Sequence, residues 1–317
     1  MKNLITTAAP HILAPFKTKG IMLDVVIALM PALIASCIIF GMRALLVVAV
    51  SVISCVLGEF TYRKAFKKTT TVSDLSAVVT GIILAFNMPV HFPLWATALT
   101  GVATIVLLKE LFGGLGFNLI NPAMGGRALL RIFMVVMLGL PIYGTLNPSL
   151  SFDAMGSATP MVYQAAGIYE NVPSYWELFL GLRFGTIGET SKIALLIGGL
   201  YLMYKRIITW HIPVIYMGSI FVISFLFGQD PLFNILTGGI FLAGFFMATD
   251  YATSPMTNSG KIIFAFGIAV ITMGIRLFGT FYDGIAFGII TMNLMVPFIE
   301  KLTKPKAFGV SKEANVK

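Results

Sequence analysis

The feature that most constrains this chain is a series of apolar runs, each near 20 residues long, that recurs from residue 21 to residue 300. A helix rises about 1.5 Å per residue, so a run of this length crosses a hydrocarbon core of about 30 Å. A membrane span must satisfy its own backbone hydrogen bonds, and these runs do not alternate as barrel strands do. The pattern therefore predicts an all-α integral membrane protein.

Ten such runs can be separated, and the composition agrees with placing them in a membrane. Hydrophobic residues make up 57% of the 317 residues and charged residues 11%, whereas soluble domains carry about 25% charged residues. The candidate spans cover residues 21–40, 43–62, 72–90, 93–111, 122–143, 190–206, 211–228, 231–249, 259–279 and 281–300. We therefore expect about ten transmembrane helices.

Basic residues lie in the short connections between the runs and indicate how the spans are oriented. With both termini in the cytoplasm, nearly all of these residues fall on the cytoplasmic side, as the positive-inside rule expects. The same rule explains the net charge of +9, and no nucleic-acid motif accompanies that charge. Residues 1–20 lack the apolar core of a signal peptide, so we predict a cytosolic leader there and a cytosolic tail over residues 301–317.

The longest connection, residues 144–189, divides the spans into two sets of five and is placed outside the cytoplasm by the span count. Because five is odd, residues 190–300 enter the membrane from the side opposite to residues 21–143, which predicts two inverted five-helix repeats. The segments TGIILAFNMP (80–89) and TGGIFLAGFFMAT (237–249) resemble each other, and paired interrupted segments build midplane sites in such folds. Glycines that merely allow close helix packing are the alternative.

Charged residues deep in the membrane would indicate an ion path, but the sequence places its carboxylates near span ends, where they can extend to the surface. These carboxylates are Asp24, Glu59, Glu110, Asp250, Asp283 and Glu300. Arg276 could pair with Asp283 across a tight turn. If polar groups line the centre, the uncharged side chains of Thr80, Asn87, Asn234 and Thr237 are better candidates.

Cysteine and histidine give no indication of a metal site or of a catalytic group. Cys37 and Cys55 are expected near opposite ends of neighbouring spans, too far apart for a disulfide or a shared metal. The three histidines occur singly, without a second ligand at helical spacing. We predict no metal centre and no catalytic residue in the chain.

A polar stretch in the long connection, SFDAMGSATPMVYQ (151–164), stands apart from its apolar surroundings. Thr159 could simply cap a short helix that begins at Pro160, a common start signal. Loops longer than about 12–15 residues are usually functional or disordered, and the aromatic residues and helix signal here favour function.

The segment KELFGGLGFNLINPAMGGRALL (109–130) is the second polar interruption. Its glycines, including Gly113 and Gly114, predict a flexible cytoplasmic turn, after which Asn121 and Pro122 restart a helix. A glycine-rich backbone allows close approach of a flat ligand. A plain connection between two helices is the alternative.

These two segments and MATDYATSP (247–255) occur in the same order in a known family. Over essentially its whole length, the chain resembles RnfD, the D-type subunit of the Rnf electron-transport complex. More distantly, it is similar to the B-type subunit of the sodium-pumping NADH:quinone reductase. The resemblance implies a redox subunit of an ion-translocating ferredoxin:NAD oxidoreductase in a bacterial or archaeal cytoplasmic membrane.

The resemblance also implies a covalent cofactor. In this family a threonine within a D-x-x-[ST]-[SG]-A-T sequence carries FMN through a phosphoester bond that a separate flavin transferase makes. The matching positions are Asp153, Ser157, Ala158 and Thr159, followed by Pro160; Gly156 departs from the pattern, since a hydroxyl residue is frequent there. A helix beginning at Pro160 would direct its amides at the phosphate.

A second, non-covalent flavin, riboflavin, is implied within the membrane region, and Gly113, Gly114 and Asn121 match the family segment associated with it. The implied partners are the other Rnf subunits, one carrying a flavin outside the cytoplasm and others carrying iron–sulfur clusters, together with membrane lipid. Two alternatives stay open: an inverted-repeat solute channel or transporter without a redox cofactor, and a passive membrane anchor. The transported ion is Na⁺ or H⁺.

Overall fold

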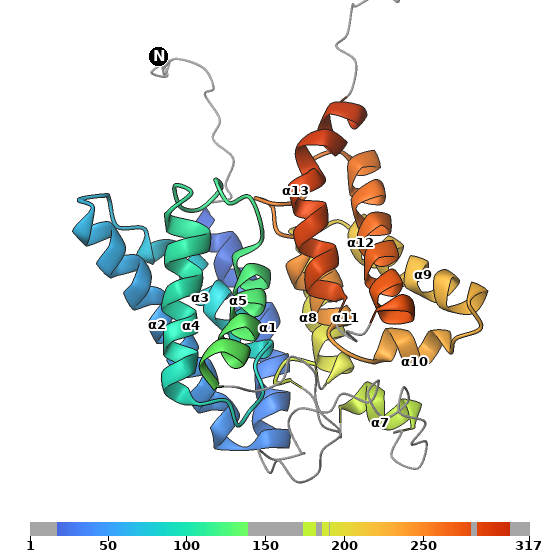
Figure 1. Ribbon diagram of the computed structural model, residues 1–317, viewed down its shortest axis with the longest axis horizontal. Coiled ribbons are helices and arrows are strands. Elements are labelled where there is room, and N and C mark those ends of the chain that lie inside the picture. Colours follow the sequence, from blue (N-terminus) through green and yellow to red (C-terminus); the bar gives the residue numbers. More distant parts are fainter. Residues whose placement is uncertain (1–17, 139–173, 182–185, 190, 280–283, 305–317) are drawn as a thin grey trace, which may run out of the picture.

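The computed structural model describes residues 18–138, 174–181, 186–189, 191–279 and 284–304, and these residues form helices, turns and loops without any strand. The fold is therefore all-α, as predicted. Figure 1 shows two groups of helices side by side, α1 to α5 in one and α8 to α13 in the other.

The first group contains α1 (Thr18–Phe40), α2 (Met42–Ala65), the 3-10 turn η1 (Val72–Asp74), α3 (Ser76–Phe86), α4 (Leu94–Ile105), the π-helical turn η2 (Val106–Glu110) and α5 (Pro122–Leu138). Helix α2 packs against both α3 and α4. At Gly81 the helices α2 and α3 come so close that an added Cβ would lie 2.7 Å from the Val52 Cα. This glycine therefore serves close packing, the alternative considered for the glycines of its segment.

The second group contains α8 (Lys192–Tyr204), α9 (His211–Leu226), α10 (Pro231–Leu236), α11 (Ile240–Leu242), the π-helical turn η4 (Ala243–Met247), α12 (Asn258–Phe278) and α13 (Ile285–Thr303). Asp230 starts α10 by accepting a hydrogen bond from the Phe233 amide at 3.1 Å. Gly238, with a φ of +68°, then separates α10 from α11, so this predicted span is interrupted.

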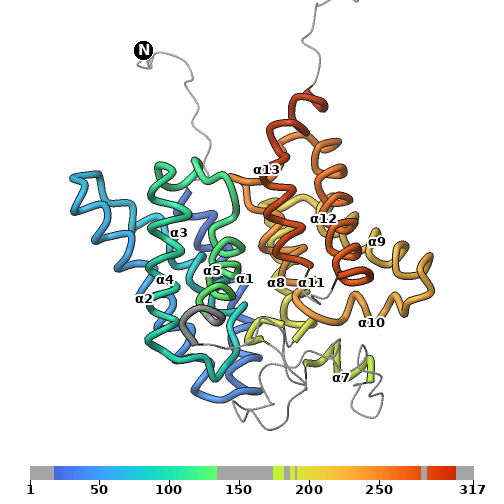
Figure 2. Tube along the Cα trace, in the orientation of Figure 1, coloured from blue at the N-terminus to red at the C-terminus, as the bar shows by residue number. Residues whose placement is uncertain are grey.

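The two groups pack together through α1 against α8 and through α5 against α13. At Gly198 of α8 an added Cβ would lie 2.0 Å from the carbonyl oxygen of Ala28 in α1, so only glycine fits there. Figure 2 follows the same arrangement along the Cα trace. The first helices of the two groups thus pack together, as do the last ones, and the two inverted repeats stay a prediction.

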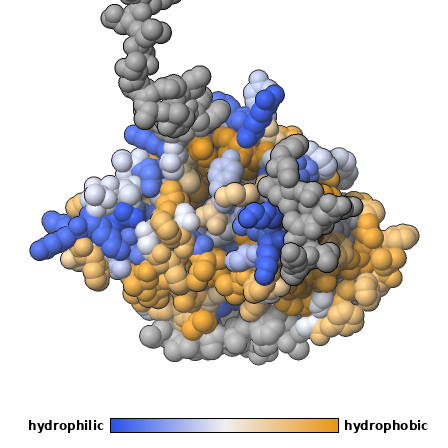
Figure 3. All heavy atoms as spheres, turned by 90° about the horizontal axis from the view of Figure 1, so that it is seen from above, coloured by the Kyte–Doolittle hydropathy of each residue, from blue (hydrophilic) through white to orange (hydrophobic). Residues whose placement is uncertain are grey.

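Helical elements occupy all ten predicted span ranges, but they differ in length. Among the described residues, α1, α2, α12 and α13 are each long and apolar enough to cross a membrane. The count of ten crossings therefore stays a prediction. Hydrophobic residues cover much of the lower and right parts of the face shown in Figure 3, and hydrophilic residues gather at its left. Many large apolar side chains are exposed, including Ile38 at 79%. Exposed apolar side chains of this kind suit contact with lipid rather than water.

The predicted extracytoplasmic connection is described over residues 174–181 and 186–189. Helix α7 (Tyr175–Leu180) begins with a capping box in which Ser174 and Glu177 bond each other's backbone amides. The predicted flavin-attachment residues Asp153, Ser157, Ala158, Thr159 and Pro160 lie outside the described residues, as does Asp283.

Candidate functional site: a pocket between the two helix groups

A cavity of about 740 Å³, its open mouth included, lies where the two helix groups meet. Its walls come from α1, α3, η2 and the η2–α5 connection on one side, and from α8, η4 and the turn after η4 on the other. Small-molecule sites typically have apolar walls with a few polar groups. The polar members here are Ser76, Thr80, Lys109, Asn118, Asn121, Thr249, Asp250 and Tyr251.

Two π-helical turns shape opposite walls of the pocket. Lys109 belongs to η2 and is 1% exposed, while Phe245 and Phe246 belong to η4. A π-turn adds a residue to the helical repeat and so changes the direction in which the following side chains point, and such turns are frequent at functional sites. Since neither turn has a proline or a charge pattern that marks it, sequence reasoning did not find them.

Asn118 is the pocket residue with an unused hydrogen-bonding atom. Its side chain is 8% exposed, and its Oδ1 atom is buried without a hydrogen-bond partner. An unsatisfied buried polar atom costs about 1–3 kcal/mol, so such atoms usually have a ligand or water as partner. Sequence reasoning named Asn121 in the same segment but not Asn118, which a search for amide side chains at the restart of α5 could have found.

Asn121 lines the pocket, but its side chain forms hydrogen bonds with other parts of the protein. Its Oδ1 accepts hydrogen bonds from the amides of Ala123 at 2.9 Å and Met124 at 3.3 Å, which caps α5. Its Nδ2 donates to the Met247 carbonyl oxygen at 3.0 Å, which joins α5 to η4 across the two groups. The predicted helix restart at Asn121 and Pro122 is confirmed.

Gly113 and Gly114 form the turn after η2, with φ angles of +119° and +97°. Neither residue is among those that line the pocket. A Cβ at position 114 would lie 2.3 Å from Nη2 of Arg63, so this glycine makes room for the arginine. The turn predicted for these glycines is present, and its observed contact is with a side chain of α2.

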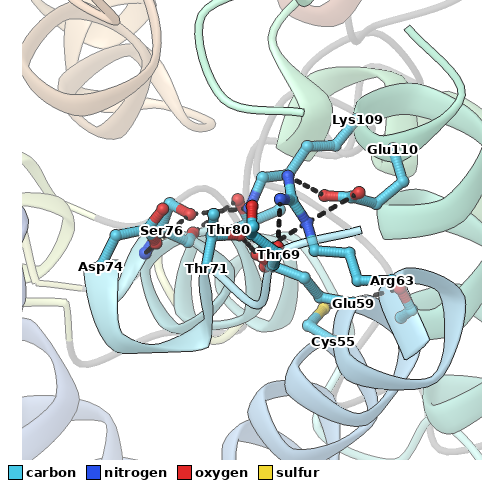
Figure 4. Close-up of polar contacts among 11 residues, drawn as sticks. Cys55, Glu59, Arg63, Thr69, Thr71, Asp74, Ser76, Thr80, Lys109 and Glu110 are labelled. Atoms are coloured by element: carbon cyan, nitrogen blue, oxygen red, sulfur yellow. Dashed lines mark hydrogen bonds and ion pairs between the residues drawn. The ribbon is translucent and has the colours of Figure 1, made fainter. Parts of the chain in front are cut away.

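Beside the pocket lies a network of buried ion pairs, shown in Figure 4, that we call the α2/η2 cluster: Glu59, Arg63, Lys109 and Glu110. Lys109 Nζ lies 2.8 Å from Glu59 Oε2, and Arg63 Nε lies 3.0 Å from Glu110 Oε2. Both carboxylates are 0% exposed. The expectation that Glu59 and Glu110 extend to the surface is therefore wrong, because partners on neighbouring helices make burial possible.

Two hydroxyl groups complete this network. Thr71 donates a hydrogen bond to Glu59 Oε1, and Lys109 Nζ also donates to Ser76 Oγ at 2.7 Å. The signal available in the sequence was the pairing of charges: Glu59 and Arg63 are one helical turn apart, and Lys109 and Glu110 are adjacent on another span. Each of these two span ends carries one acidic and one basic residue, a pattern that indicates ion pairs between the two spans.

A second group of buried charges, the α5/α12 cluster, contains Arg127, Glu189, Lys192 and Arg276, each at most 9% exposed. Arg127 Nη2 lies 3.1 Å from Glu189 Oε1, and Lys192 Nζ donates to the Glu189 carbonyl oxygen. Arg276 Nη1 donates to the Asn234 carbonyl at 2.8 Å. Arg276 therefore binds the last carbonyls of α10, where the helix dipole favours a cation.

The four uncharged polar residues predicted to line the centre are all buried. Asn87, directly after α3, accepts a hydrogen bond from Arg127, and the carbonyls of Asn234 and Thr237 accept from Arg276 at 2.8 and 3.2 Å. Thr80 instead lines the pocket. The four residues are thus interior, while their place at the centre of the membrane stays a prediction. Three of them contact arginine side chains that the sequence had not associated with them.

Asp250, in the turn after η4, faces the pocket opposite Lys109. Its oxygens accept hydrogen bonds from the Thr253 hydroxyl at 3.1 Å and the Ala252 amide at 3.4 Å. Burial raises the pKa of this carboxyl group above its ordinary value of 3.8, although the two hydrogen bonds oppose the change. Cys37 and Cys55 are both free, and the described residues contain no group of three metal-ligating side chains.

The fold and the pocket define an all-α membrane protein with a partly polar pocket at the junction of two helix groups and a network of buried ion pairs beside it. The profile of the NQR2, RnfD, RnfE family matches residues 5–309, and the chain belongs to this family.

Three relatives illustrate the similarity, and each is named as the D-type subunit of an ion-translocating complex. The chain is 46% identical over 312 residues to that of the Na⁺-translocating ferredoxin:NAD⁺ oxidoreductase complex of Acetobacterium woodii, covering 98% of this chain and 96% of that protein. It is 37% identical to that of the proton-translocating ferredoxin:NAD⁺ oxidoreductase complex of Clostridium ljungdahlii, covering 97% of each. It is 33% identical to that of the ion-translocating oxidoreductase complex of Aliivibrio salmonicida, covering 96% and 98%.

Proposed function

We propose that this protein is the D-type subunit of an ion-translocating ferredoxin:NAD⁺ oxidoreductase complex and that it relays electrons through bound flavins. The relatives that carry this name match nearly the full length of the chain, at 46% and 37% identity. The observation that carries the redox proposal is the pocket, with the unpaired Asn118 oxygen among the polar groups that line it.

The pocket residues fit a non-covalent flavin such as riboflavin. Phe245, Phe246 and the aliphatic side chains around them supply apolar walls for a flat ring. Asn118 Oδ1 can accept a hydrogen bond from a ring N–H or a ribityl hydroxyl, while Lys109 Nζ can donate to a ring oxygen. When bound, a flavin supplies one- and two-electron transfer, and the protein provides binding and orientation.

A covalent FMN on Thr159 is the second part of the proposal, and it rests on the sequence D-A-M-G-S-A-T-P over residues 153–160. In this proposal a flavin transferase attaches the phosphate to the Thr159 hydroxyl. Asp153, Ser157 and Ala158 form the sequence that the transferase reads, and a helix beginning at Pro160 would stabilise the phosphate.

The remaining parts concern the setting of the subunit. The protein lies in a bacterial or archaeal cytoplasmic membrane with both termini in the cytoplasm, as the positions of its basic residues suggest. Its partners are the iron–sulfur and flavin subunits of the complex. The ion is Na⁺ or H⁺, since the relatives at 46% and 37% identity are named for different ions.

The covalent flavin is tested by denaturing the protein after coexpression with a flavin transferase and recording in-gel fluorescence. We expect a fluorescent band for the wild type and none for Thr159→Ala, while Ser151→Ala retains the band because Ser151 lies outside the sequence over residues 153–160. A colourless wild-type band would contradict the FMN proposal. It would favour the solute channel or the passive anchor.

The non-covalent flavin is tested by extracting flavin from the native, detergent-purified Thr159→Ala variant, which removes the covalent contribution. We expect about one flavin per chain, and a clear loss when Asn118→Leu is added. Leu119→Ala is the matched control, because Leu119 is the adjacent residue, is 55% exposed and does not line the pocket. Equal flavin content in all three proteins would reject Asn118 as a ligand-binding residue.

A further inference from the structure

A chain of three hydrogen-bonding side chains connects the pocket with the molecular surface. Lys109 Nζ donates to Ser76 Oγ at 2.7 Å, and Ser76 Oγ donates to Asp74 Oδ1 at 2.5 Å. Lys109 and Ser76 line the pocket and are 1% and 4% exposed, whereas Asp74, at the end of η1, is partly exposed. The three groups lie close together in Figure 4.

The local backbone places these groups in line. Leu75 takes up a left-handed conformation, with a φ of +65°, between η1 and α3. This turn lets the Asp74 carboxylate accept the Ser76 backbone amide at 2.8 Å as well as the Ser76 hydroxyl. The aspartate is thus fixed at the start of α3, one hydroxyl away from the buried ammonium group.

We propose that Asp74, Ser76 and Lys109 conduct a proton between the solvent and the redox ligand of the pocket. The inference rests on the proposed function, because it requires a ligand that takes up protons when it is reduced. Chains of hydroxyl and ionisable groups that lead into a membrane protein are a recognised form of proton relay.

Each transfer along this path conserves protons and electrons. A bound redox ligand would receive its electrons from one-electron carriers of the complex, and Lys109 Nζ would give it one proton as that N–H bond breaks. The neutral amine receives the Ser76 hydroxyl proton, and Ser76 receives one from a protonated Asp74 carboxyl group. Water reprotonates Asp74. Oxidation of the ligand runs the same transfers in reverse.

The charged groups around Lys109 hold it in this position. Glu59 of α2 lies 2.8 Å from Lys109 Nζ, and Arg63 and the Cys55 thiol belong to the same helix. Glu110 adjoins Lys109 and pairs with Arg63, while Asp250 and Tyr251 face the pocket from the other helix group. The ion pair with Glu59 therefore fixes the Lys109 ammonium group beside the Ser76 hydroxyl.

Asp250 is the other carboxyl group at the pocket, and its hydrogen bonds keep it within its own turn. Its oxygens accept from Ala252 and Thr253, two and three residues further along the chain. Asp74 instead accepts a hydrogen bond from the Ser76 hydroxyl, which itself accepts one from Lys109 Nζ, so this carboxylate is joined to the buried ammonium group. The geometry therefore favours entry at Asp74.

The test uses purified full-length Thr159→Ala protein with its non-covalent flavin, reduced by excess dithionite in a stopped-flow instrument in H₂O and D₂O. In Ser76→Ala we expect at least a tenfold slower bleaching of the flavin absorbance, with flavin content and midpoint potential unchanged. Ser76→Thr keeps the hydroxyl and should restore the rate. Thr97→Ala is the control, because Thr97 is a buried hydroxyl residue that donates to the Pro93 carbonyl and does not line the pocket.

Chemical rescue distinguishes a proton path from a structural role. We expect Asp74→Asn to reduce slowly and to recover when imidazole buffer is added, since a small acid can replace a surface carboxyl group. Imidazole should not restore the rate of Ser76→Ala, because the missing hydroxyl group is buried between Asp74 and Lys109. A merely structural role for Asp74 would leave the slow rate unchanged by imidazole, and that result would overturn the proposal.

The remaining outcomes separate the proposal from the function on which it rests. A stoichiometric flavin with wild-type rates and isotope effects in Ser76→Ala would reject the proton path and leave the flavin site intact. Loss of flavin from Ser76→Ala would reassign Ser76 to ligand binding and also reject the path. A wild-type protein that binds no flavin would overturn both.

Discussion

The two clusters of buried charges in this protein are stabilised in different ways. In the α2/η2 cluster two cations pair with two carboxylates, so the side chains neutralise one another. The α5/α12 cluster contains three cations and one carboxylate, and backbone carbonyls and Asn87 bind much of the excess positive charge. In a direct ion pair, losing one partner leaves the other buried charge uncompensated. Where backbone carbonyls at a helix end bind a cation, several groups share the stabilisation of its charge.

The strongest test of this comparison is Arg63→Ala. Among the described residues, Arg63 is the cation paired with Glu110, whose side chain is fully buried. We expect a loss of about 3–5 kcal/mol in the free energy of unfolding, because the Glu110 charge stays without compensation. Denaturation of the detergent-solubilised protein measures it. The control is Lys64→Ala, a change at the exposed neighbouring residue.

A double substitution sharpens the same test. Replacing both partners, as Arg63→Met with Glu110→Gln, removes the two charges together and should recover most of the lost stability. If the double variant is no more stable than Arg63→Ala, the loss comes from packing of the arginine side chain rather than from the unpaired carboxylate.

Arg127→Ala should be less costly, at about 1–3 kcal/mol in the free energy of unfolding. Glu189 is then left with the nearby Lys192, whose charge attracts it, so the carboxylate is not isolated. Ile132→Ala, at a 60% exposed position of the same helix, is the control. A loss as large as that of Arg63→Ala would contradict the proposed difference between the clusters.

Three glycine-to-alanine substitutions distinguish the cost of a left-handed backbone from the cost of a clash with a residue of the buried charge clusters. Gly114 and Gly116 both have a positive φ, +97° and +91°, but only Gly114 lies against Arg63. A left-handed alanine costs about 1–2 kcal/mol, so Gly116→Ala should lose that amount in unfolding free energy and Gly114→Ala more. Gly239→Ala should lose least, because its φ is ordinary and its closest contact, Glu189 Oε1, would be at 3.2 Å. Equal losses at positions 114 and 116 would show that Arg63 moves aside without cost.

The smallest effect concerns Asp250→Asn and its dependence on pH. Because the pKa of Asp250 is raised in the folded state, its contribution to stability is greatest below the ordinary pKa of 3.8 and declines as pH rises through the raised value. The asparagine variant should lack this decline and melt slightly higher than the wild type at neutral pH. Parallel curves of melting temperature against pH for the two proteins would show that the carboxyl group is not perturbed.

The sequence allowed some parts of the candidate site to be predicted. The turn at Gly113 and Gly114 and the helix restart at Asn121 followed from local composition and polarity. Asn118 was missed, because nothing local distinguishes an amide that caps a helix from one that points into a cavity. Glu59 and Glu110 were assigned to the surface, since their partners lie on other segments of the chain.

Hydropathy and helical length, both local properties, determined from the sequence that this protein is an all-α membrane protein and where its helical segments lie, and its motifs showed which family it resembles. Only the tertiary structure decided which charges are buried and how the pocket forms. Lys109 meets Glu59 and Asn121 meets Met247 through packing between distant segments. A buried charge or polar atom is stable only with its partner in place, and that partner is set by the packing of helices.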